Sequence, residues 1–174
     1  LAAGFRQLLK RDDLGFFKWP QYRDEYQRLI DIANQLRKKQ TRLVVVGLGG
    51  SQSGGQCLVE SITGANHNVE FWGEIDPHFL DSKLSSPLLD DTTFLIISKS
   101  GNTLEIAAMM NVIHEKLAAN GISLSTRSYV VTENRENNPL REWALSADVP
   151  LIDHPKDVGG RFSVFTPTGI LPAV

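Results

Sequence analysis

The chain has 174 residues, of which 41% are hydrophobic and 22% charged, and its formal net charge is −2. This length suits one globular domain with a sizeable core, and no apolar run reaches the 18 residues of a membrane-spanning helix. The balance of 18 basic and 20 acidic residues predicts no nucleic-acid and no membrane partner, so an anionic ligand would need local donors. The single cysteine, Cys57, excludes an intrachain disulfide; we expect it to be a small buried side chain in a reducing, cytoplasmic protein.

Residues 1–40 have the pattern of an N-terminal helical segment. A short amphipathic stretch at 5–9 and an aromatic connector at 12–20 precede a longer helix. The apolar stripe of this helix recurs at helical spacing at Tyr22, Tyr26, Leu29, Ile30, Ala33 and Leu36. We interpret the stripe as core and expect no function in this segment. The first residue is Leu1 rather than Met and the last residues are apolar, which suggests a fragment of a longer protein.

From position 41 the pattern changes to strands that alternate with helices. Strands are predicted at 43–46, 69–72, 92–97, 128–131 and 149–152. Helices are predicted at 54–62, 77–84, 103–119 and 139–146, with Asn138-Pro139 beginning the last and Asn120-Gly121 ending the third. This alternation predicts an α/β domain over 41–174, a doubly wound three-layer sandwich with a five-stranded parallel sheet, preceded by the N-terminal helices.

The stretch 94–105 is the strongest candidate for a binding site. It runs from a buried strand through a hydroxyl-rich loop into a helix, and the free N–H groups and dipole of a helix N-terminus favour an anion. Gly101 allows close approach to the backbone, and three hydroxyls add donors for a phosphate, those of Ser98, Ser100 and Thr103. The alternative is that Asn102 and Glu105 form a capping box that only starts the helix.

Two other loops follow strand ends and should meet the 98–103 loop at the carboxyl edge of the sheet. In the loop 47–53, Gly47 and Gly49 match part of a dinucleotide fingerprint, but Gln52 breaks it and the lysine of a Walker A loop is missing. What remains is a glycine-rich turn with the hydroxyl of Ser51, and Ser53 has capping-box spacing to Gln56. Such a loop favours a small phosphorylated ligand, such as a sugar, over a nucleotide.

The loop 157–163 supplies a cation. We expect Gly159 and Gly160 to adopt unusual backbone angles beside Arg161, whose guanidinium can hold a phosphate or stabilise developing negative charge. The alternative for an isolated arginine is a surface ion pair.

These three loops resemble successive motifs of the phosphoglucose isomerase family. The matching runs are Gly47-Leu-Gly-Gly-Ser51, Ser98-Lys-Ser-Gly-Asn-Thr-Leu-Glu105 and Asp157-Val-Gly-Gly-Arg-Phe-Ser-Val-Phe-Thr-Pro-Thr-Gly169. The third is highly specific, whereas the first two are shared among sugar-isomerase (SIS) domains. Departures are mild: Asn102 stands where the family usually has threonine, and Ser53 and Gly55 replace a leucine and a proline.

The resemblance implies interconversion of glucose 6-phosphate and fructose 6-phosphate through a cis-enediol, without a metal or organic cofactor. The phosphate would be held by Ser98, Ser100 and Thr103 with the Lys99 region beside them, and the sugar by Gly50, Ser51 and Gly160. Arg161 would stabilise the enediolate, and Glu105 would orient a histidine.

The family's base, a glutamate, belongs to a second SIS domain, as do a further histidine and lysine, so we expect this chain alone to be nearly inactive. The resemblance also implies a homodimer for the full-length protein. A non-catalytic SIS module that senses a phosphosugar for a regulator is the alternative function.

Overall fold

The fold is built on one five-stranded parallel sheet. A computed structural model describes residues 2–11, 14–39, 42–64, 67–85 and 89–174. The strands are β1 (Arg42–Gly47), β2 (Val69–Trp72), β3 (Thr92–Ile97), β4 (Ser128–Glu133) and β5 (Leu151–His154). They lie in the order β2-β1-β3-β4-β5, and every neighbouring pair is parallel. The predicted α/β class is therefore confirmed.

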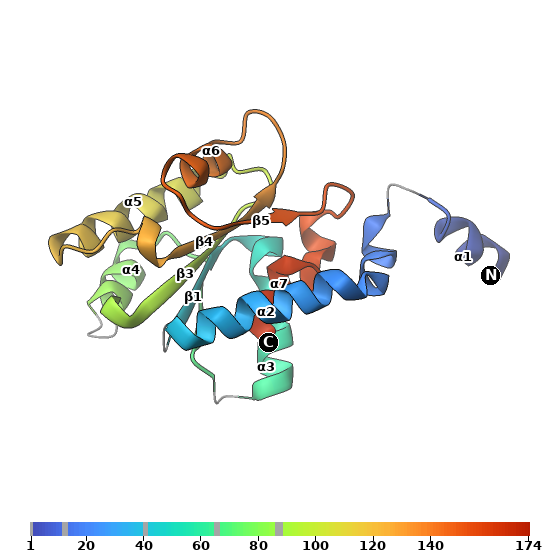
Figure 1. Ribbon diagram of the computed structural model, residues 1–174, viewed down its shortest axis with the longest axis horizontal. Helices are drawn as coiled ribbons and strands as arrows, with labels where there is room; N and C mark the ends of the chain where they lie inside the picture. The colour runs from blue at the N-terminus through green and yellow to red at the C-terminus, as the bar shows by residue number, and fades with distance from the viewer. Residues whose placement is uncertain (1, 12–13, 40–41, 65–66, 86–88) are drawn as a thin grey trace.

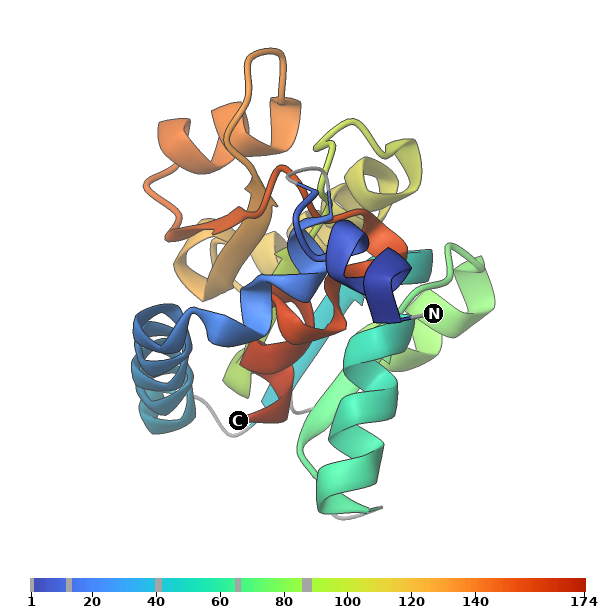
Figure 2. The same cartoon turned by 90° about the vertical axis from the view of Figure 1, so that its right-hand side faces the viewer.

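Helices cover both faces of the sheet, which makes three layers (Figures 1 and 2). One face carries α4 (Pro77–Leu84), α5 (Leu104–Ala119) and α6 (Pro139–Ser146), and the other carries α2 (Arg23–Lys39), α3 (Ser53–Thr63) and α7 (Pro167–Ala173). The first helix, α1 (Ala2–Leu8), lies apart from the sheet in Figure 1, and two short 3-10 turns at Gly15–Phe17 and Trp19–Gln21 connect it to α2. Within the described residues, no helix has both the length and the apolar character needed to cross a bilayer.

Each face of the sheet has its own hydrophobic core. Side chains that alternate along β1, β3 and β4 divide between the two cores. The core on the side of α4, α5 and α6 contains Val44, Val46, Phe94, Ile96 and Val130. The core on the side of α2 and α7 contains Val45, Leu95, Ile97 and Val131. All six residues of β3 are buried, which explains why its sequence is apolar without alternation.

The fifth strand begins two residues later than predicted. The N–H of Val149 donates to the carbonyl of Ala144 at 2.8 Å, so this residue still closes the end of α6. Pro150 has no N–H to give to a ladder, and the strand therefore starts at Leu151. Helix α7 was not predicted; Pro167 is its first residue and Thr166 its N-cap.

Helix ends were predicted with mixed success. Asn138 caps α6 by accepting a hydrogen bond from the N–H of Arg141 at 3.0 Å, as expected. The predicted capping box of Ser53 and Gln56 is wrong, because Ser53 is already helical and α3 has no side-chain cap. Cys57, expected to be buried, is exposed on α3.

Candidate functional site

A cavity of about 450 Å³ lies at the carboxyl edge of the sheet, where the loops after β1, β3, β4 and β5 meet. Helix α3 leaves β1 towards one face and α5 leaves β3 towards the other, so the cavity lies at the topological switch point of the sheet. Eight of the residues predicted for the site line it, namely Gly50, Ser51, Ser98, Lys99, Ser100, Thr103, Gly160 and Arg161. The predicted meeting of the three loops is thus observed.

The 98–103 loop is anchored through its carbonyl groups. Four successive carbonyl oxygens accept hydrogen bonds from β4 and the segment after it. The pairs are Thr132 Oγ1 to Ser98 (2.7 Å), Glu133 N to Lys99 (3.1 Å), Arg135 Nη2 to Ser100 (2.9 Å) and Leu140 N to Gly101 (3.3 Å). The backbone acceptors of this loop are therefore occupied on the side of β4 and α6.

The N–H groups of the same region remain available. Among the described residues, no acceptor pairs with the N–H of Lys99, Ser100 or Thr103, nor with those of the first three residues of α5. Unpaired donors at the N-terminus of a 16-residue helix, together with its dipole, favour an anion.

Two hydroxyls of the loop form a pair that leaves one proton free. Ser98 Oγ lies 2.9 Å from Thr103 Oγ1 and accepts the N–H of Gly101 at 3.1 Å. Two hydroxyls have two protons, and their mutual bond uses one. Ser98 is only 3% exposed, whereas Thr103 is partly exposed at the cavity, so Thr103 is the better placed to give the free proton to a ligand.

The alternative for this stretch, a capping box of Asn102 and Glu105 at the start of α5, is not observed. The helix begins at Leu104, and its N-cap is Thr103, which makes no side-chain cap bond. Asn102 lies outside the helix, so it cannot pair with Glu105 in the way the box requires. The hydroxyl of Thr103 therefore has no capping role that would compete with a ligand.

Arg161 reaches the cavity on a short 3-10 helix, Gly160–Phe165. The expectation of unusual backbone angles before it is wrong, because Gly159 has φ −69° and Gly160 is not among the residues with positive φ. A glycine is needed instead at Gly50, where a Cβ would overlap the Gly160 carbonyl. No carboxylate of the described residues pairs with Arg161, so the alternative of a surface ion pair is not observed.

The side chain of Lys99 is occupied by protein acceptors. Its Nζ donates to the carbonyls of Lys156 at 2.9 Å and Val158 at 2.7 Å. The carboxylate of Glu133 lies 3.9 Å away.

Glu133 and Arg135 line the cavity but were not predicted. The sequence signal was available, since Glu133 ends β4, the strand beside β3, and Arg135 follows two residues later. The segment after β4 was not considered because its residues match no phosphate-binding motif.

Glu105 lies outside the cavity lining, in the first turn of α5, and is partly buried. No described histidine makes a hydrogen bond or ion pair with it. Its predicted role, orienting a histidine, stays a prediction.

His154 ends β5 below the cavity and is 3% exposed. Burial lowers the pKa of its imidazole below the ordinary 6.5, and the nearby Lys99 ammonium lowers this pKa further, although the contact with the Pro155 carbonyl opposes the shift. The ring is therefore neutral at physiological pH. Within the described residues, no cluster of His, Cys, Asp and Glu has the arrangement of a metal site.

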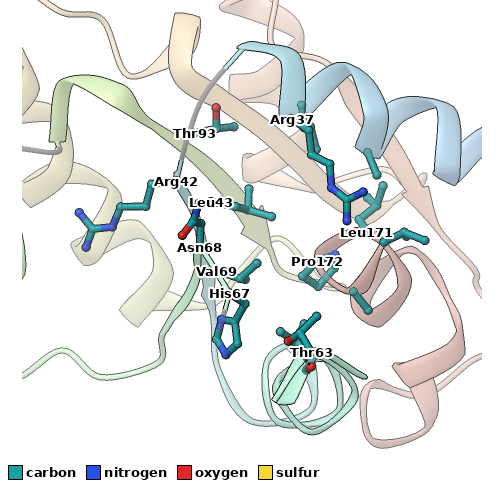
Figure 3. A pocket seen from close by; sticks show the side chains of 15 residues that line it. Arg37, Arg42, Leu43, Thr63, His67, Asn68, Val69, Thr93, Leu171 and Pro172 are labelled. Carbon is teal, nitrogen blue, oxygen red and sulfur yellow. Dashed lines mark hydrogen bonds between the residues drawn. The ribbon is translucent and has the colours of Figure 1, made fainter. Parts of the chain in front are cut away.

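A second cavity, of about 480 Å³, lies near the opposite end of the strands, between the sheet and α2, α3 and α7 (Figure 3). The guanidinium of Arg42 points away from it in Figure 3 and pairs with Glu70 at 2.6 Å. Burial alone would raise the pKa of Glu70, but hydrogen bonds from Lys83 and Trp72 and the charge of Arg42 outweigh it and lower this pKa. We place the candidate site at the carboxyl edge, where hydroxyls, free N–H groups and Arg161 meet.

The fold defines a class, the α/β domains of the SIS type. A phosphosugar isomerase of Bacteroides fragilis has this fold, with a TM-score of 0.61 at 20% identity over 98% of this chain and 87% of that one. A model of the family described as phosphoglucose isomerase matches residues 30–174. The chain therefore belongs to the phosphoglucose isomerase family.

Individual relatives agree with this assignment. The chain is 34% identical to a glucose-6-phosphate isomerase of Mesoplasma florum over 92% of its own length, and 31% identical to one of Carboxydothermus hydrogenoformans over 98%. A solved glucose-6-phosphate isomerase of Chlamydia trachomatis matches this chain with a TM-score of 0.74 at 27% identity. The match covers 84% of this chain and 28% of that structure. The chain spans about 40% of the length of the two sequence relatives.

Proposed function

We propose that this chain is the phosphate-binding portion of a glucose-6-phosphate isomerase. The enzyme would interconvert glucose 6-phosphate and fructose 6-phosphate. The observation that carries the proposal is the convergence of free N–H groups, hydroxyls and Arg161 on one cavity at the switch point of the sheet. The family relationship supports the choice of a phosphosugar over other phosphorylated ligands.

The roles follow from the chemistry of the lining residues. Ser100, Thr103 and the free N–H groups of the 98–103 loop bind the phosphate, and Ser98 holds the Thr103 hydroxyl in place. Gly50, Ser51 and Gly160 contact the sugar from the other side of the cavity.

In the reaction a base removes the proton from C2 of the open-chain aldose, and a proton is returned to C1. The enediolate between these steps carries negative charge on oxygen, and the guanidinium of Arg161 stabilises that charge. Arg135 adds a second cation at the cavity.

The proposal assigns the proton transfer to groups outside this sequence. We infer from the family resemblance that the base, and the histidine that Glu105 would orient, come from another part of the full-length protein, which would act as a cytoplasmic homodimer. Isomerisation by the 174-residue chain should therefore stay at the background rate. Turnover that Glu133→Gln abolishes would instead place the base inside this chain.

Calorimetric titration tests the binding function directly. The chain should bind fructose 6-phosphate and inorganic phosphate but not fructose, because the phosphate provides the charge that the loop recognises. Equal binding of fructose, or no binding of either phosphate compound, would contradict the proposal.

A further inference from the structure

The segment that delivers Arg161 to the cavity is held from the inside by Lys99. We name residues 156–162 the Arg161 arm. The ammonium of Lys99 donates to the carbonyls of Lys156 and Val158 in this arm, at 2.9 and 2.7 Å. An ammonium has three N–H donors, so two of the three are taken by carbonyls of the arm. The carboxylate of Glu133, 3.9 Å away, pairs with the same ammonium as an ion pair.

The arm is held from the outside by the N-terminal segment. The N–H of Gly15 donates to the carbonyl of Asp157 at 3.1 Å, between the two carbonyls that Lys99 binds. The carboxylate of Asp157 also packs against the Cα of Gly15, where a Cβ would force it to turn aside. The ring of Phe16 stacks on that of Phe162, with centroids 4.7 Å apart and planes 16° apart. Three successive carbonyls of the arm are therefore held, from opposite sides.

We propose that Lys99 is a positioning residue, which fixes the Arg161 arm relative to the phosphate-binding loop and does not itself bind the phosphate. The inference rests on the proposed function of the cavity. Lys99 lies between Ser98 and Ser100 in sequence, so its backbone belongs to the anion site while its side chain binds the arm. A lysine in a phosphate loop would otherwise be assigned to the ligand, and the hydrogen bonds of this one favour a different role.

The consequence is that loss of the ammonium should loosen the arm and leave the anion site formed. We expect Lys99→Met to raise amide hydrogen exchange at residues 158–163 at least tenfold in the unliganded chain. Affinity for inorganic phosphate should fall no further than in Lys156→Met, which removes an exposed cation from the same arm. Phe16→Leu should also raise exchange in the arm, because it removes the outer support.

A measurement on the wild-type chain does not depend on how well the variants fold. The ¹⁵N resonance of the Lys99 ammonium should keep its chemical shift when inorganic phosphate is added, because its partners are the carbonyls of the arm. A shift that saturates with phosphate would make Lys99 a ligand and overturn the proposal. So would unchanged arm exchange in Lys99→Met combined with a tenfold loss of phosphate affinity beyond the Lys156→Met control.

A different result would show that the proposed function of the cavity is wrong. If the wild-type chain bound neither inorganic phosphate nor fructose 6-phosphate, the cavity would not be a phosphate site. The exchange measurement uses the unliganded chain and would still decide whether Lys99 holds the Arg161 arm.

Discussion

The hydroxyl pair of Ser98 and Thr103 predicts a non-additive loss of affinity. Only one of its two protons is free for a phosphate, and Thr103 is the residue exposed to the cavity. We therefore expect Ser98 to act through Thr103, by donating to its oxygen and orienting its proton. Substitution of both residues should then cost no more binding energy than Thr103→Val alone.

The magnitudes follow from ordinary hydrogen-bond energies. Thr103→Val removes a hydrogen bond to a charged group, about 1.5–3 kcal/mol, or roughly 10- to 150-fold in Kd. Ser98→Ala removes the orienting partner, a neutral hydrogen bond of about 0.5–1.5 kcal/mol. In the double variant this second loss should disappear, so the coupling free energy should be about 0.5–1.5 kcal/mol. Thr103 is extended and makes no cap bond, so valine fits its backbone.

Calorimetry with fructose 6-phosphate on the wild type, both single variants and the double variant measures this coupling. Ser128→Ala is the matched control, because Ser128 is equally buried but donates to the Leu124 carbonyl at the other end of β4. It should lower stability without changing affinity. Additive losses from the two single substitutions would mean that each hydroxyl contacts the phosphate independently, and would refute the reasoning.

Three other substitutions test neighbouring features. Gly50→Ala should lower the free energy of unfolding by about 1–3 kcal/mol, since its Cβ would lie 2.8 Å from Arg161 N and overlap the Gly160 backbone. Gly160→Ala is the control: its Cβ meets no atom within 4 Å, so thermal unfolding should not change. Arg135→Gln should weaken binding of inorganic phosphate and reduce its dependence on ionic strength; an unchanged salt dependence in calorimetry would remove Arg135 from the site. Burial lowers the pKa of His154, so below pH 6.5 the unfolded chain binds more protons than the folded chain. The free energy of unfolding should therefore fall as the pH drops below that value. Urea unfolding at about pH 5.5 and pH 7.5 measures this fall, which His154→Gln should reduce.

The sequence predicted the centre of the sheet well because the central strands β1, β3 and β4 are mostly buried on both faces. β3 is wholly apolar or Thr and is buried throughout, so its bounds coincide with the prediction. The error at β5 arose where a tertiary hydrogen bond, from Val149 to Ala144, decided the boundary. Such a bond depends on how α6 ends and leaves no local pattern in the sequence.

The sequence predicted which loops form the site, but not which hydrogen bonds hold those loops in place. Position after a strand end was enough to bring Ser98, Gly50 and Arg161 to one cavity. The partners of Lys99 could not be predicted, since the carbonyls that it binds lie 57 and 59 residues further along the chain and carry no side-chain signal. For the same reason the segment 1–40 was expected to lack function, although Phe16 stacks on a residue that lines the cavity.

The net charge of the whole chain does not describe the cavity, which has the local donors that the sequence analysis expected for an anionic ligand. The whole chain is acidic by two charges, yet the cavity is lined by three cations, Lys99, Arg135 and Arg161, and by one carboxylate, Glu133. The surplus of two positive charges matches a phosphate ester in its dianionic form. Lys99 and Glu133 pair with each other, so the surplus belongs to Arg135 and Arg161. Because salt screens charges beyond about 10 Å, these two cations and the dipole of α5 decide binding, while the acidic surplus elsewhere does not oppose it.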